Sequence, residues 1–126
     1  MKKILFAAAA VSLLATPAFA DLAAELSTGQ THAGMAATQT DIAMAHKHLQ
    51  HALNCLVGPS GDGFDAAAGN PCAKAGNGAI PDSNDGAQKA KLTAAAATAK
   101  AGVANTDLAG AQAAAKQTAD AIGAAK

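Results

Sequence analysis

The sequence predicts an all-α fold: an antiparallel helical hairpin with a disulfide-tied loop, which could form a four-helix bundle as a dimer. Three observations support this prediction. A mostly apolar series of residues recurs at alternating steps of three and four between about residues 30 and 56, which is the spacing of one helix face. Alanine, the strongest helix former, occupies 18 of the 44 residues from Ser83 onward. The segment 57–81 between these regions contains six glycines and three prolines, a composition typical of a loop.

Residues 1–20 have the features of a secretory signal peptide. Lys2 and Lys3 precede a short apolar run, and Ala18-Phe19-Ala20 provides a small-x-small cleavage site. We therefore expect cleavage after Ala20, export to the periplasm and a mature single helical domain over 21–126. Because the apolar run is too short to span a bilayer as a helix, we expect no membrane insertion after cleavage.

The charge of the mature chain limits the classes of partner. Without Lys2 and Lys3, seven lysines stand against nine acidic residues, which gives a net charge of −2 with neutral histidines. The sequence also has no arginine. Since contacts to phosphates and bases depend on basic side chains, we expect no nucleic-acid partner.

We expect the main helix at about residues 30–56. One face forms a heptad-like seam, made of His32, Met35, Gln39, Ile42, His46, Leu49, Leu53 and Leu56. The opposite face has different chemistry at helical spacing, with Met44, His48, His51 and Cys55. Neighbouring side chains on this second face are one turn apart and can meet.

A glycine- and proline-rich loop over 57–81 follows this helix. Cys55 and Cys72 are an even pair in an exported chain, for which a disulfide is the default expectation. The bridge would enclose 16 residues and contribute about 3 kcal/mol to stability by the loop-entropy argument. It would hold the loop against the end of the main helix.

Two alanine-rich helices are expected at about 83–104 and 107–124. Between them, the polar run from Asn105 to Asp107 is typical of a helix cap. The mature chain has no Trp or Tyr and a single Phe, Phe64, so the core of one copy is thin. A homodimer or a periplasmic protein partner would add buried area.

The histidines of the main helix are candidate metal ligands. His48 and His51 are one turn apart, and neutral imidazole binds copper, nickel and zinc. Met44 could add a thioether, and Asp41 a carboxylate oxygen. We include His46 in the candidate set, although on a regular helix it points about 160° away from His48 and would need local unwinding to join it. The alternative interpretation is that these histidines are solvated helix residues. His32, on the seam, has weaker support than His46 and is not included in the candidate set.

Other functions have less support in the sequence. We expect no enzyme, because no catalytic triad, paired carboxylates or phosphate-binding glycine loop is present. We expect no haem, because the Cys-x-x-Cys-His signature is absent and aromatic residues are few. The alternative to metal binding is a structural or chaperone-like periplasmic interaction module that presents a helical face to a partner.

The run from His46 to His51, together with the helical content and the signal peptide, resembles the small periplasmic histidine-containing metal-binding proteins of Gram-negative bacteria. The chain has fewer histidines than expected for that group, and it adds the disulfide loop. The resemblance implies a role in binding copper or another divalent metal for His48 and His51.

Overall fold

A computed structural model describes residues 20–126, and these residues form five α-helices without a β-strand. The all-α prediction is therefore confirmed. The helices are α1 (Leu22–Ala37), α2 (Ile42–Val57), α3 (Ala79–Asp82), α4 (Gly86–Ala104) and α5 (Leu108–Ala124). The predicted signal peptide lies outside the described residues, except for Ala20. Among the described residues, none of the helices is both long and apolar enough to cross a membrane.

An aspartate begins each of the four long helices. The side chains of these N-cap residues accept a hydrogen bond from the backbone N–H three positions later, at Asp21, Asp41, Asp85 and Asp107. Such a bond satisfies one of the free N–H groups of the first turn, and the negative charge complements the helix dipole. The four helix starts are thus fixed by local chemistry.

The predicted single helix at 30–56 is wrong, because the chain breaks between Ala37 and Ile42. Thr38 is the C-cap of α1, and the Asp41 carboxylate accepts from the Met44 N–H at 2.9 Å to start α2. The series of residues at alternating steps of three and four continues across this break, so the sequence pattern did not reveal it. The predicted role of Asp41 as a metal ligand is thereby replaced by a capping role.

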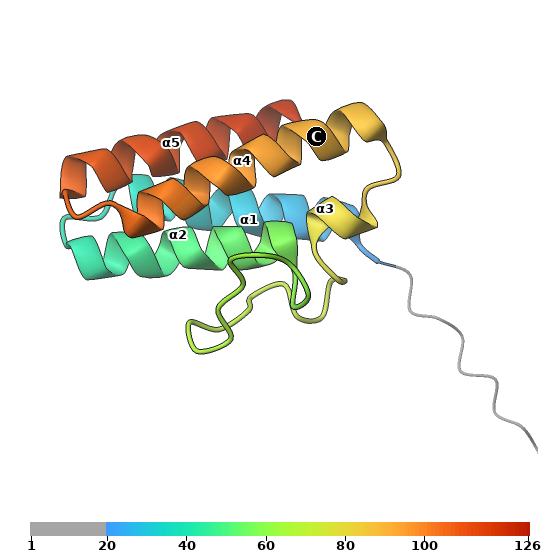
Figure 1. The fold of residues 1–126 in the computed structure, drawn as a ribbon, viewed down its shortest axis with the longest axis horizontal. Coiled ribbons are helices and arrows are strands. Elements are labelled where there is room, and N and C mark those ends of the chain that lie inside the picture. The colour runs from blue at the N-terminus through green and yellow to red at the C-terminus, as the bar shows by residue number, and fades with distance from the viewer. Residues whose placement is uncertain (1–19) are drawn as a thin grey trace, which may run out of the picture.

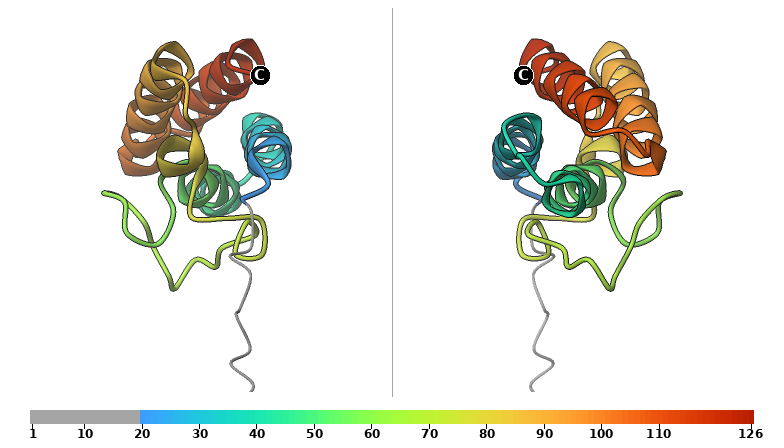
Figure 2. Two further views of the ribbon diagram at one scale, coloured as in Figure 1. Left: turned by 90° about the vertical axis from the view of Figure 1, so that its right-hand side faces the viewer. Right: turned by 90° about the vertical axis from the view of Figure 1, so that its left-hand side faces the viewer.

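The four long helices of a single chain pack side by side (Figures 1 and 2). Helix α1 packs against α2 and α5, and α4 packs against α2 and α5. The short connections α1–α2 and α4–α5 make these two pairs antiparallel. One chain thus supplies four long helices, in place of the expected hairpin of one main helix and two returning alanine-rich helices, and dimerisation remains a prediction.

The core lies among the four helices and is built mainly from leucine and alanine. The fully buried large side chains of the core include Leu49, Leu53 and Leu56 of α2, Leu92 of α4 and Ile122 of α5. Small residues let the helices approach closely. At Gly102, a methyl group would lie 2.5 Å from the Leu49 side chain and 2.6 Å from the Ala114 side chain. The alanine-rich helices begin and end within a few residues of their predicted bounds.

The predicted disulfide is confirmed: Cys55 and Cys72 are bonded, with 5.2 Å between their Cα atoms. It ties the loop after α2 to the end of that helix. Figure 1 shows most of the loop below α2, whereas Asp62, near the start of the loop, reaches α4 and pairs with Lys100. At the start of the loop, Gly58 has a φ of 70°, and a Cβ there would overlap the Asn77 carbonyl. Only glycine fits this close crossing of the two loop ends.

The far end of the loop meets α1 at a buried acidic side chain. Glu25 is 0% exposed, and its Oε1 accepts a hydrogen bond from the Gly78 N–H at 2.8 Å. Its Oε2 is buried without a hydrogen-bond partner. Burial raises the pKa of Glu25 to about 7; Asp82 and Asp21 also raise it, against the opposing effect of the Gly78 hydrogen bond.

Candidate metal centre

Three of the four histidines lie together where α1 and α2 pack side by side. His32 comes from α1, and His48 and His51 come from α2. One ring nitrogen of each lies within 4.8 Å of the others. The ring centroids are 4.9 Å apart for His32 and His51, 5.5 Å for His32 and His48, and 6.0 Å for His48 and His51. This arrangement is compatible with a metal site.

The turn at Thr38–Asp41 creates this cluster. His48 and His51 are three residues apart on one helix and therefore share a face. His32 is on the preceding helix, and the reversal of the chain after Ala37 brings it across to them. On a continuous helix, His32 and His48 would be about 24 Å apart along the axis, because they are 16 residues apart in the sequence.

His51 is oriented by the disulfide loop. Its Nε2 lies 2.7 Å from the carbonyl oxygen of Ala68. Because a carbonyl oxygen can only accept, Nε2 carries the proton, and in the neutral ring Nδ1 has a free lone pair. That Nδ1 is buried and has no hydrogen-bond partner. An imidazole with one nitrogen bonded to a backbone carbonyl and the other free is the usual arrangement of a metal-binding histidine.

His32 and His48 face each other through the same ring atom. Their Nδ1 atoms are 3.3 Å apart, and the two rings are inclined by only 26°. In neutral rings without a metal, one of these nitrogens must donate a proton to the other. A metal ion between them would use both lone pairs.

Burial and neighbouring charges favour the neutral form of His32 and His48. Burial lowers the pKa of His32, and the neighbouring His51 and His48 lower it further. The pKa of His48 is lowered by burial, by His51 and by Lys47. Since only an unprotonated imidazole nitrogen binds a metal, a lowered pKa keeps the ligands available at neutral pH.

One predicted ligand, His46, lies outside the cluster. The Nε2 of His46 lies 2.8 Å from the carbonyl oxygen of Asn105, between α4 and α5, and His46 is not part of the cluster. It ties α2 to the turn between those helices. Met44 is an exposed side chain in the first turn of α2, 40% accessible. Cys55 and Cys72 form the disulfide and offer no thiolate.

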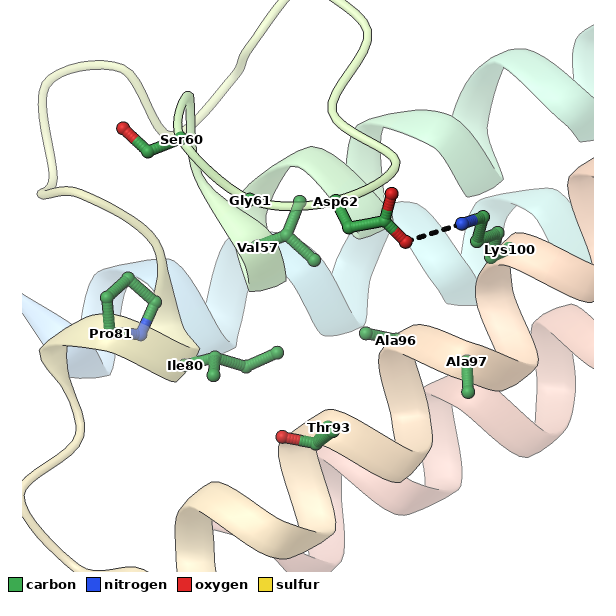
Figure 3. Close-up of a pocket in the computed structure, with 10 residues that line it drawn as sticks. All are labelled: Val57, Ser60, Gly61, Asp62, Ile80, Pro81, Thr93, Ala96, Ala97 and Lys100. Carbon is green, nitrogen blue, oxygen red and sulfur yellow. Dashed lines mark hydrogen bonds and ion pairs between the residues drawn. The ribbon is translucent and has the colours of Figure 1, made fainter.

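The surface also has an apolar groove of about 580 Å³ between the end of α2, α3 and α4 (Figure 3). Val57, Ile80 and Ala96 line it, and Asp62 and Lys100 form an ion pair at its rim. Both charged side chains are more than half exposed, so their pairing contributes little. The groove contains few polar groups with which to select a ligand, and the histidine cluster is the stronger candidate site.

Comparison of the chain with protein-family models, with curated proteins and with solved structures finds no match.

Proposed function

We propose that this protein binds one transition-metal ion per chain through His32, His48 and His51. The observation that carries the proposal is the buried, unpartnered Nδ1 of His51 in a cluster with two further imidazoles. An unsatisfied buried polar atom costs about 1–3 kcal/mol. A metal ion would satisfy this nitrogen and, with it, the nitrogens of His32 and His48.

The spacing favours a tetrahedral ion. Two nitrogens bound to zinc at about 2.0–2.1 Å and at the tetrahedral angle are about 3.3–3.4 Å apart. The Nδ1 atoms of His32 and His48 are 3.3 Å apart before any adjustment. Adjacent ligands of a square-planar or octahedral ion would be about 2.9 Å apart at the same bond length. We therefore propose zinc, whose tetrahedral coordination this spacing fits; copper(II), which in general binds nitrogen sites more tightly than zinc, is the competing ion.

Three protein ligands leave a fourth tetrahedral position for water or for a donor from another molecule. Met44, four residues before His48, is the nearest candidate donor in the sequence of α2. The disulfide indicates an oxidising compartment, which supports the proposed export to the periplasm. The protein would bind or carry a metal there.

The test is a calorimetric titration of the oxidised chain from Asp21 with zinc, copper(II) and nickel at neutral pH. We expect one zinc per chain with micromolar or tighter affinity. Each of the variants His32→Ala, His48→Ala and His51→Ala should weaken binding by more than about 100-fold, since a lost ligand costs more than the 10–100-fold of a lost supporting residue.

His46→Ala is the matched control, because it removes an imidazole from the same helix but outside the cluster. It should leave zinc affinity unchanged. Absence of binding to the unmodified chain would refute the proposal. So would binding that survives the removal of His32, or that requires His46.

A further inference from the structure

We propose that Asn54 is a positioning residue of this metal site, acting through the disulfide loop on His51. The inference rests on the proposed function, because the site that Asn54 supports is the histidine cluster. Asn54 does not belong to the cluster itself. Its side chain instead holds the loop segment whose carbonyl group orients the His51 ring.

The Asn54 side chain is fully buried and all four of its hydrogen-bonding positions are used. Its Nδ2 donates to the carbonyl oxygens of Asp65 and Gly69, each at 2.8 Å. Its Oδ1 accepts from the Asp65 N–H at 3.0 Å and from Gln50 Nε2 at 2.9 Å. The exposed fraction of Asn54 is 0%. A fully satisfied buried amide of this kind fixes the backbone that it contacts.

The two loop residues bound by Asn54 bracket Ala68, which is the residue that contacts His51. Asp65 lies three positions before Ala68, and Gly69 directly follows it. The Gly69 carbonyl is bound to Asn54 and the Ala68 carbonyl is bound to His51. Since Asn54 and His51 are one turn apart on α2, consecutive carbonyl groups of the loop bind neighbouring side chains of the same helix.

This arrangement decides which nitrogen of His51 can bind a metal. With the Ala68 carbonyl in place, Nε2 keeps the proton and Nδ1 is free. Without it, the ring could rotate or change tautomer, and Nδ1 would be less often available. The disulfide to Cys72 closes the loop, but Cys72 is four residues from Ala68, whereas Asn54 binds on both sides of that residue.

Asn54→Ala tests the proposal by two measurements. The first is the ¹⁵N chemical shifts of the His51 ring without metal, which report the tautomer. We expect the Nε2–H tautomer to dominate in the unmodified chain and a mixture or a ring rotation in the variant. The second is zinc affinity, which should fall by about 10–100-fold, as for other residues that support a metal ligand.

Gln88→Ala is the matched control. Gln88 is also a side-chain amide that links separate elements, since its Nε2 donates to the Ala125 carbonyl and its Oε1 accepts from Ser83. Its loss should destabilise the fold without changing the His51 tautomer or the zinc affinity. If Asn54→Ala does not fold, Asn54→Ser replaces it, because the hydroxyl keeps a neutral polar group at the buried position and is too short to bind both Asp65 and Gly69.

A folded Asn54 variant with an unchanged His51 tautomer and unchanged zinc affinity would overturn the proposal. Failure of the unmodified chain to bind zinc would instead refute the proposed function. In that case the tautomer measurement alone still decides whether Asn54 positions the His51 ring.

Discussion

Helices α1 and α2 carry all four histidines of the chain, whereas α4 and α5 carry none. The first pair also holds the disulfide loop, through Asn54 and Cys55. The second pair contributes mainly alanine to the core, with Leu92 and Ile122 as its largest fully buried apolar side chains. One half of the bundle thus supplies the candidate ligands and the contacts that orient His51, and the other half supplies a surface on which the first half packs.

This division predicts that changes in the two halves have different consequences. Substitutions in α4 and α5 should change the free energy of unfolding and leave the metal affinity of the folded protein unchanged. Substitutions in the disulfide loop, or of Asn54 and Cys55 that hold it, should change both the free energy of unfolding and the metal affinity.

The largest expected effect on stability is in the alanine-rich half. Leu92→Ala removes a side chain that is 0% exposed from the core, and should lower the free energy of unfolding by about 3–5 kcal/mol through lost burial and a cavity. Chemical denaturation measures this loss. Zinc affinity, measured below the unfolding transition, should be unchanged. A loss of zinc affinity in Leu92→Ala would show that the alanine-rich half also supports the metal site.

Removal of the disulfide tests the other half. Cys55→Ser with Cys72→Ser opens a closed loop between residues 17 apart, and should cost about 3 kcal/mol of stability. Serine avoids free thiols, which would themselves bind the metal. Unlike Leu92→Ala, this double variant should also weaken zinc binding, because the Ala68 carbonyl loses one of its supports. Unchanged zinc affinity would assign the support of His51 to Asn54 alone.

The buried Glu25 makes the loop end sensitive to pH. Its pKa is raised from 4.5 to about 7 in the folded protein, so the folded state binds the extra proton. The stabilising contribution of this proton is fully present below pH 4.5 and is lost as the pH rises through about 7. Glu25→Gln should therefore be more stable than the unmodified chain at pH 8, by up to about 3 kcal/mol.

The measurement is the difference in unfolding free energy between Glu25→Gln and the unmodified chain from pH 4 to pH 8. Glutamine keeps an oxygen for the Gly78 N–H, so this hydrogen bond is retained. A difference that does not grow with pH would contradict the neutral state of Glu25.

The smallest expected effect concerns the close packing between the halves. Gly102→Ala places a methyl group against Leu49 and Ala114 and should cost about 1–3 kcal/mol by overpacking. Gly86→Ala is the matched control, because its added Cβ would meet no atom within 4 Å. Denaturation of both variants compares the two sites. Equal stability of the two variants would mean that the helices can separate at Gly102 without loss.

The sequence predicted the features that depend on local chemistry. The alanine content located α4 and α5, and the two cysteines indicated the bridge. It did not reveal the break between α1 and α2, because the three-four spacing runs through it. Thr38, Gln39, Thr40 and Asp41 were the available signal, since threonine and aspartate favour helix ends over helix interiors.

That single error determined what was missed in the candidate site. On one continuous helix, His32 belongs to the seam and lies far along the axis from His48, whereas His46 points about 160° away from His48 with or without the break. With the turn in place, His32 joins the cluster and His46 binds the Asn105 carbonyl. The role proposed for Asn54 depends on loop carbonyls 11 and 15 residues away in sequence, which no helical periodicity can locate.

The most direct test of the metal site is to follow the ring signals of the four histidines by NMR during a zinc titration of the oxidised chain from Asp21. We predict that the signals of His32, His48 and His51 change together and reach completion at one zinc per chain. The His46 signals should stay unchanged as an internal control. A titration that leaves any of the three cluster histidines unaffected, or that shifts His46 with them, would contradict this assignment.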